Sequence, residues 1–319
     1  MGSLEDADIL RREAAWADLV LHAADASDHV GAAVAISEGL RFVSSGQQHH
    51  DVTHPTTASN PRENKDNKKK KYWLHTGGNG ILTYFDTSAN RIGFPPSSPE
   101  KVFDDLEGVA ELTSLPDEAF HRNVDKIVLE CGTVHADKGV RTAIVCPPTI
   151  YGNGRGPVSG RSRQCYGMAK FILTKGQIPI VGTGQSKMNN VHIYDLTEAY
   201  IALIEAAVSG NDSAELWGER GYHFVVTGEH TWGPLARLMG RVVHDKGLSQ
   251  TEELEEYKLT RDEAVEYAGF EALSWGLNAL TRARRLEKYL GWKPRHPSLE
   301  EEVPGIVEAE AKRLGLLPY

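Results

Sequence analysis

Three arginines close to a glycine-rich stretch could bind a charged group. Arg155, Arg161 and Arg163 lie within or just after Gly152-Asn153-Gly154-Arg155-Gly156. A guanidinium can hold a carboxylate or a phosphate through two parallel hydrogen bonds, so these side chains could grip an anionic substrate. A solvated surface explains the same three charges, and both interpretations stay open.

His121 could transfer protons, because an imidazole changes its charge near neutral pH. It falls within residues 117–137, where Val124, Ile127 and Cys131 recur at three- and four-residue steps and predict an amphipathic helix. A plain histidine on the surface of that helix is the alternative interpretation.

Thiols and other histidines do not indicate a metal site. The three cysteines form no C-x-x-C pair, and their odd number predicts reduced thiols rather than a disulfide framework or a zinc site; they are Cys131, Cys146 and Cys165. The trio His49, His50 and His54 could take up a metal ion, but a solvated loop explains it more simply. We therefore expect no metal.

Strands alternate with helices along the chain, and this pattern calls for a mostly parallel sheet with right-handed crossovers. Apolar runs predict strands at residues 18–24, 72–76, 142–146, 178–181, 190–194 and 222–226. Periodicity predicts helices at residues 6–17, 28–40, 117–137, 231–247 and 298–314. Another helix is expected to begin at Asp195 as its N-cap, in a capping box with Glu198, and to end at Gly210.

Residues 41–71 interrupt the pattern. Almost no apolar residue follows Val52, and the segment ends in the lysine run Lys68 to Lys71. Such a segment cannot bury enough apolar surface to offset the entropy lost on ordering, so we expect a disordered insertion. The lysine run could alternatively act as a nucleic-acid patch or a localisation signal.

Small residues and prolines follow three of the predicted strands. Open parallel sheets bind ligands in the crevice beyond the carboxyl ends of their strands, so these residues are expected to border a ligand. They are Ala23, Ala24, Thr76, Gly77, Pro147 and Pro148.

The composition excludes several classes of protein. The chain has 319 residues and a formal net charge of -9, whereas nucleic-acid-binding proteins usually carry a basic face. No apolar run is long enough to span a bilayer, and the N-terminus lacks the basic and apolar regions of a secretory signal. We expect a cytoplasmic protein with neither a nucleic-acid partner nor a membrane partner.

Four segments match, in order, the elements of a known family. Residues 18–24 look like a fourth strand, and residues 144–152, which end in Pro147-Pro148-Thr149-Ile150-Tyr151-Gly152, look like a sixth strand and its exit. Residues 178–195 match a VGxG…VHVxD element, and residues 286–294 match an LGWxP element. In these features the chain resembles the extended short-chain dehydrogenase/reductase family, which includes NAD-dependent epimerases and dehydratases.

The resemblance implies an α/β fold, namely a Rossmann-like doubly wound parallel sheet, incomplete at the N-terminus, with a smaller C-terminal substrate lobe. Residues 1–150 would form a partial NAD(P)-binding domain that carries the insertion 41–71. Residues 151–319 would form the rest of the sheet and the substrate lobe. The implied activity is that of an oxidoreductase or epimerase that uses NAD or NADP on a small carbonyl or hydroxyl compound, with a homodimer as a possible assembly.

The resemblance also implies roles for single residues. The candidates for catalysis are Lys126, His121 and Thr76, of which Lys126 and Thr76 would also contact the cofactor. The other candidates would line the cofactor (Ala23, Ala24, Pro147 and Pro148) or the substrate (Tyr151 and Arg155).

Three departures from the family pattern bear on activity. The G-x-x-G-x-x-G turn that holds the pyrophosphate does not occur, and we expect roughly the first sixty residues of a complete member, about two βα units, to be missing. The tyrosine expected four residues before Lys126 is Arg122, which cannot release its proton, and Gly77 stands where a catalytic serine is expected. A non-catalytic NAD(P)-binding regulatory protein of the NmrA-like kind, or an inactive truncated family member, is therefore the alternative.

Overall fold

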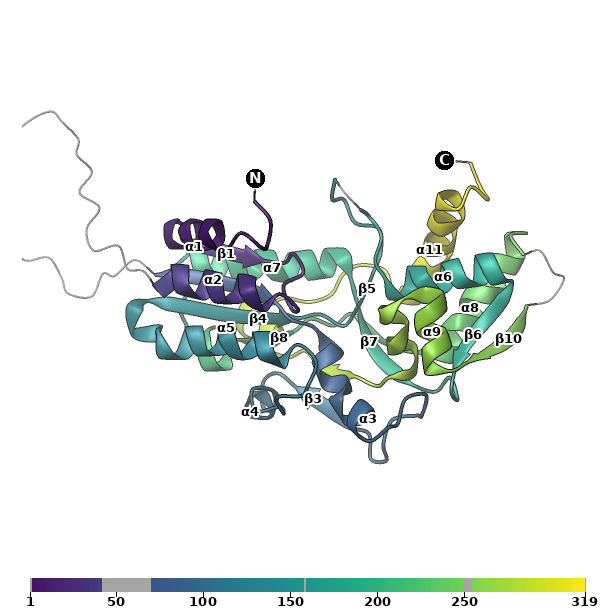
Figure 1. Ribbon diagram of the computed structural model, residues 1–319, viewed down its shortest axis with the longest axis horizontal. Helices are drawn as coiled ribbons and strands as arrows, with labels where there is room; N and C mark the ends of the chain where they lie inside the picture. Colours follow the sequence, from purple (N-terminus) through teal and green to yellow (C-terminus); the bar gives the residue numbers. More distant parts are fainter. Residues whose placement is uncertain (1, 42–69, 158, 250–253, 319) are drawn as a thin grey trace, which may run out of the picture.

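Figure 1 shows the computed structural model, which describes residues 2–41, 70–157, 159–249 and 254–318. One part of the molecule is a parallel sheet with helices on both faces, and the other is a smaller lobe built around the strands β6 (Gln177–Val181) and β10 (Glu255–Leu259).

Four parallel strands form the main sheet, in the order β1-β2-β4-β8. Their bounds are β1 Leu19–His22, β2 Lys71–Thr76, β4 Val140–Cys146 and β8 Tyr222–Phe224. In the register of these strands, Val20 of β1 lies opposite Trp73 of β2, and Trp73 lies opposite Thr142 of β4. As a result the carboxyl ends of β1, β2 and β4 meet at one end of the sheet.

Successive side chains of β2 pack on opposite faces of the sheet. Trp73 belongs to the same core as Ile36 and Val128, whereas Leu74 belongs to the core that contains Leu203. The first core includes residues of α1 (Ala7–Trp16), α2 (Val30–Arg41) and α5 (Arg122–Val134), which cover that face. The second core includes residues of α7 (Ile193–Val208) and α10 (Arg285–Leu290), which cover the other face. Burial on both faces explains why these strands are apolar at nearly every position.

The lobe has its own small parallel pair, β6 with β10, and four longer helices. These are α6 (Gln164–Lys175), α8 (Trp232–Asp245), α9 (Arg261–Ala268) and α11 (Leu299–Arg313). Capping boxes start two of them, because Thr260 bonds reciprocally with Glu263 before α9, and Ser298 does so with Glu301 before α11.

Two further small sheets are present. One has the order β5-β7-β9, with bounds Thr149–Tyr151, Lys187–His192 and Gly228–Thr231, and the other pairs β3 (Val102–Asp104) with β11 (Leu280–Arg282). The short helices are α3 (Tyr84–Ser88), α4 (Val109–Leu112), η1 (Asn79–Thr83), η2 (Ala136–Lys138), η3 (Gly218–Arg220) and η4 (Phe270–Gly276).

The expected fold class is confirmed, since the chain forms a Rossmann-like parallel sheet flanked by helices, with a smaller lobe. Two local expectations need correction. The N-cap of α7 is His192, whose Nδ1 accepts a hydrogen bond from the Tyr194 backbone, and Asp195 lies inside the helix. The predicted insertion 41–71 falls mainly outside the described residues, but Arg41 ends α2 and Lys71 begins β2. Within the described ranges, none of the helices is long and apolar enough to cross a membrane.

Candidate functional site

Two cavities lie beyond the carboxyl ends of β1, β2 and β4, where open parallel sheets generally bind ligands. The sheet cavity has a volume of about 450 Å³ and is lined by the loops that leave these three strands. The lobe cavity has a volume of about 440 Å³ and reaches toward η1, α3 and η4. Both cavities share a wall, which consists of Asp28, Pro147, Pro148, Arg163 and Gln164.

The floor of the sheet cavity is made of small residues at strand ends. Ala23, Thr76 and Gly77 line it together with the two prolines. A Cβ added to Gly77 would stand 3.0 Å from Ile144 Cγ2, so this position has no room for a side chain unless its neighbours move. The Thr76 hydroxyl lies 2.5 Å from the Tyr200 hydroxyl and is therefore held in place.

A buried carboxyl group lies directly beneath this floor. Asp125, on the first turn of α5, is fully buried, and its Oδ2 accepts a hydrogen bond of 3.0 Å from the Tyr222 hydroxyl. Its Oδ1 has no hydrogen-bond partner among the described residues and would lie 3.3 Å from a Cβ on Gly77. Burial raises the pKa of Asp125 to about 7, although the Tyr222 hydrogen bond lowers it in part.

His121 stands at the start of α5 in a backbone conformation that few residues adopt. Its φ is 68°, in the left-handed region, and such positions often occur at functional sites. Nδ1 lies 2.8 Å from Oδ1 of Asp28, which comes from the loop between β1 and α2. Nε2 faces Gly78 and Gly80, where an added Cβ would lie 3.3 Å and 3.2 Å away.

In the His121–Asp28 pair, the imidazole is held in one orientation and is in the charge state that proton uptake requires. Burial lowers the pKa of His121 below its usual value of 6.5, and the carboxylate of Asp28 offsets part of this effect. The imidazole is therefore neutral at neutral pH, with Asp28 placed to stabilise the charge that it would gain with a proton. This arrangement, an imidazole oriented by a carboxylate, is that of a general acid or base.

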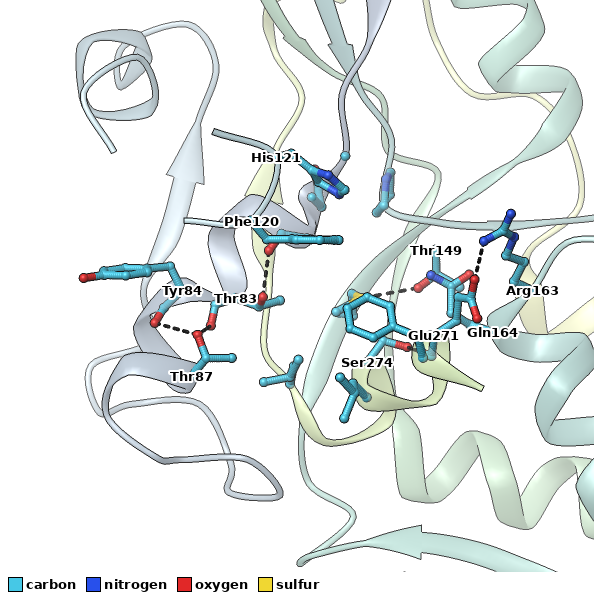
Figure 2. Close-up of a pocket in the computed structure, with 18 of the residues that line it drawn as sticks. Thr83, Tyr84, Thr87, Phe120, His121, Thr149, Arg163, Gln164, Glu271 and Ser274 are labelled. Carbon is cyan, nitrogen blue, oxygen red and sulfur yellow. Dashed lines mark hydrogen bonds and ion pairs between the residues drawn. The ribbon is translucent and has the colours of Figure 1, made fainter. Parts of the chain in front are cut away.

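The lobe cavity presents aromatic rings as well as polar groups. The rings of Phe120 and Phe270 lie with their centroids 5.6 Å apart, and the two residues are 41% and 57% exposed. Figure 2 shows Phe120 and His121 on one side of this cavity, with Thr149, Gln164, Glu271 and Arg163 across from them.

Two of the three arginines near the glycine-rich stretch are paired with carboxylates and border the cavities. Arg161 is bound to the buried Glu310, and Arg163 is bound to Glu271. The positive charges of these two arginines are therefore largely neutralised by carboxylates of the protein itself.

Five of the residues expected at the site are found there. Ala23, Thr76, Pro147 and Pro148 line the sheet cavity, and His121 lines the lobe cavity. Lys126 lies elsewhere, because successive positions on a helix point about 100° apart and Asp125 takes the inward position. The Lys126 ammonium instead bonds Asp117 at 2.8 Å on the outer face of α5.

Three other expected residues lie outside both cavities. Ala24 borders a separate hollow beside β1. Tyr151 is buried and its hydroxyl donates to the Pro297 carbonyl at 2.7 Å, so it holds two segments together. Arg155 stacks on the Tyr194 ring at 4.4 Å and donates a hydrogen bond to its hydroxyl.

Asp28 and Asp125 are the site residues that sequence reasoning missed. Asp28 lies 93 residues before His121 in the chain, and no local pattern links the two. Asp125 did leave a signal in the sequence, since it follows His121 by four residues, a spacing that within a continuous helix places two side chains on one face. The pair His121 and Asp125 thus takes the spacing that the family pattern gives to tyrosine and lysine.

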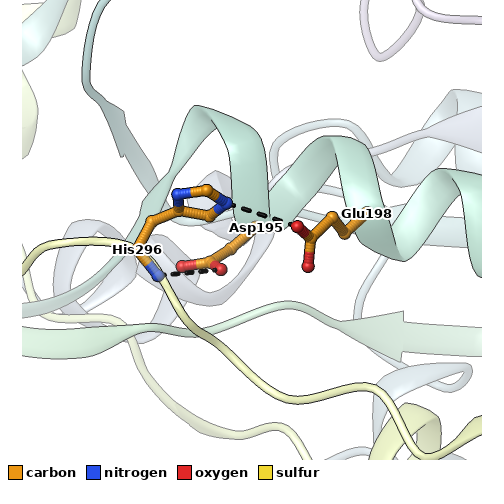
Figure 3. A group of neighbouring side chains, drawn as sticks. All are labelled: Asp195, Glu198 and His296. Atoms are coloured by element: carbon orange, nitrogen blue, oxygen red, sulfur yellow. Dashed lines mark hydrogen bonds and ion pairs between the residues drawn. The ribbon is translucent and has the colours of Figure 1, made fainter.

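A cluster of Asp195, Glu198 and His296 has the composition of a metal site but is explained by hydrogen bonds (Figure 3). Oδ1 of Asp195 accepts the backbone N–H groups of Arg295 and His296, at 2.8 and 3.3 Å. Its Oδ2 accepts the hydroxyl of Thr227 at 2.9 Å. Oδ1 therefore joins α7 to the segment that precedes α11, and Oδ2 joins it to the segment between β8 and β9.

A family model and a curated protein both match the sequence of this chain. A model of the NAD dependent epimerase/dehydratase family matches residues 123–216. The curated protein Oxidase ucsJ of Acremonium sp is 34% identical over 321 residues, an alignment that covers 99% of this chain and 84% of that protein.

Solved structures of nucleotide-sugar enzymes share the fold. UDP-glucose 4-epimerase of Thermotoga maritima, solved with UDP-glucose, matches with a TM-score of 0.57 and 13% identity over 98% of this chain and 84% of its own. A dTDP-glucose 4,6-dehydratase of Streptomyces venezuelae, solved as a double mutant with NAD bound, matches with a TM-score of 0.60 and 13% identity over 99% and 80%. At this identity the likeness concerns the fold alone.

Proposed function

Because the chain belongs to the NAD-dependent epimerase/dehydratase family of extended short-chain dehydrogenases, we propose that it is an NAD(P)-dependent oxidoreductase whose acid/base residue is His121. The observation that carries this proposal is the hydrogen bond between His121 and Asp28 beside the wall shared by the two cavities. An imidazole held by a carboxylate replaces the tyrosine that is missing from the sequence.

The sheet cavity suits the nicotinamide end of NAD or NADP. Its floor of Ala23, Thr76 and Gly77 would let a flat ring and its ribose approach the backbone. Asp125 supports this assignment, because Oδ1 is buried without a partner among the described residues and lies beneath Gly77. We assign residues 1–150 to the cofactor side and residues 151–319 to the rest of the sheet and the substrate lobe.

When bound, the cofactor supplies the acceptor or donor of a hydride. In the oxidation direction, His121 takes the proton of a substrate hydroxyl at Nε2 while a carbonyl group forms. Asp28 stabilises the imidazolium that results and keeps Nε2 turned toward the cavity. In the reduction direction, the same nitrogen returns the proton to the carbonyl oxygen.

A calorimetric titration with NADH and with NADPH tests whether the protein binds the cofactor that the proposed activity requires. We expect binding with a Kd in the micromolar range for one of them, and Lys126→Ala should leave this Kd unchanged because Lys126 points away from both cavities. Absence of binding to the folded protein would refute the proposal. A loss of binding in Lys126→Ala would restore lysine to the role that the family pattern gives it.

The variant Asp28→Asn should shift the pH profile of alcohol oxidation. The Asp28 carboxylate raises the pKa of His121, so its removal lowers that pKa further, and the acidic limb of kcat/KM moves to lower pH. The rate at neutral pH should fall about tenfold to a hundredfold, the worth of a hydrogen bond to a charged group. Profiles from pH 5 to 9 that coincide for both proteins would contradict the assignment of Asp28.

A further inference from the structure

We propose that the lobe cavity binds an uncharged, largely apolar alcohol or ketone rather than a nucleotide sugar. The proposal rests on the proposed function, because it assigns the substrate class of the same site. Three properties of the cavity wall support it, namely its aromatic surface, its charge balance and the position of its polar atoms.

The aromatic surface of the cavity is open to a ligand. Phe270 is 57% exposed and Phe120 is 41% exposed, although large aromatic residues normally hide most of their surface. Met188, Leu273 and Leu277 add apolar side chains to the same wall. An apolar ligand that covers these groups gains the free energy of removing both surfaces from water.

The charge balance of the wall disfavours a diphosphate. The lining includes three carboxylates, Asp28, Glu118 and Glu271, and two guanidinium groups, Arg163 and Arg261. Arg163 already pairs with Glu271, and Asp28 with His121, so the side chains of the wall carry no excess positive charge. A nucleotide diphosphate needs several free cationic groups or helix N-termini to compensate its charge.

A second polar group lies beside His121 and could bind the reacting end of a substrate. Asn79, the first residue of η1, is buried and lines the cavity, and its Oδ1 has no partner within the described part of the chain. A substrate hydroxyl could be held there between Asn79 and His121. The apolar body of the substrate would then extend along Phe120 toward Phe270, an arrangement common in small-molecule sites.

The test compares ligands that differ only in apolar size, in the absence of turnover. Binding of cyclohexanone, 1-tetralone and a steroid ketone is measured by saturation-transfer NMR and calorimetry, with UDP-glucose as the competing class. Affinity should rise with size, by up to about fourfold for each methylene that becomes buried. UDP-glucose at the same concentrations should not displace 1-tetralone.

Variants locate the binding surface. Phe270→Ala should weaken 1-tetralone binding about tenfold or more, and Phe270→Leu should restore part of the affinity. Phe94→Ala is the matched control, because Phe94 is 51% exposed but does not line the cavity, and it should bind normally. Thermal unfolding identifies any variant that does not fold, and the leucine variant then decides the question.

The outcomes separate this proposal from the proposed function. Ketones that bind through Phe270 without oxidising NADH or NADPH would support the substrate class and refute the activity. Turnover of UDP-glucose or dTDP-glucose, with ketone affinities unaffected by Phe270, would support the activity and overturn the substrate class.

Discussion

His121→Asn is expected to lower kcat by a factor of about 10²–10⁴ while leaving the affinity for NADH unchanged, because the variant removes a general base and little else. Asparagine tolerates the left-handed backbone of position 121 and can still hydrogen-bond to Asp28, but it cannot take up a proton. The variant should therefore fold normally but lose most of its catalytic activity. Steady-state turnover and calorimetric NADH titration measure the two properties separately.

His244→Asn is the control for this experiment. His244 lies on α8 with its side chain 55% exposed, outside both cavities, so its substitution should leave kcat within error of the original protein. Equal activity of His121→Asn and His244→Asn would exclude His121 from the reaction. A protein with no turnover before or after substitution, but with NADH bound, would favour the regulatory function.

The protein should lose stability steeply as the pH falls below 6.5. Four buried histidines have pKa values lowered mainly by burial, to about 4 for His22 and His223 and about 3 for His75 and His230. They stay neutral in the folded state but take up protons on unfolding, so acid favours the unfolded chain. Each contributes about 1.4 kcal/mol per pH unit between pH 6 and its folded pKa.

Two buried carboxyl groups act in the opposite direction. Burial raises the pKa of Asp105 to about 6 and that of Asp125 to about 7, so both hold a proton when folded and release it on unfolding at pH 5. Four histidines outnumber two carboxyl groups by two. These six groups by themselves should therefore lower the free energy of unfolding by about 2.7 kcal/mol from pH 5.5 to pH 4.5.

Urea unfolding at a series of pH values measures this slope. His75→Leu removes one histidine and should make the dependence shallower by about 1.4 kcal/mol per pH unit, whatever the variant costs at neutral pH. Asp125→Asn removes an opposing carboxyl group and should make it steeper by a similar amount. A slope that neither variant changes would mean that these groups are solvated in the folded protein.

Much of the fold could be predicted because its signals are local. The strand expected at residues 142–146 is present as Val140–Cys146, and the helix expected at 298–314 as Leu299–Arg313. Errors arose where contacts distant in sequence decide the structure. Asp195 looks like an N-cap, but it lies inside α7, and its carboxylate accepts the backbone N–H groups of residues 295 and 296.

The candidate site was harder to predict for the same reason. The strand ends that carry Ala23, Thr76 and Pro147 could be placed by the general rule for parallel sheets. Asp28, the partner of His121, could not be predicted. It lies in the loop after β1, and this loop meets the start of α5 only in the folded protein. A shift of one helical position separates Lys126, exposed, from Asp125, buried, and only the packing of α5 decides between them.

The wall that the two cavities share has a thermodynamic consequence. Arg163 and Gln164 line both spaces, so a ligand that repositions either side chain in one cavity changes the binding free energy in the other. Such coupling is reciprocal: whatever factor the cofactor applies to substrate affinity, the substrate must apply to cofactor affinity. If the coupling is favourable, binding of either ligand raises the affinity for the other. The order of binding would then depend on the relative concentrations of the two ligands and not on a separate gate.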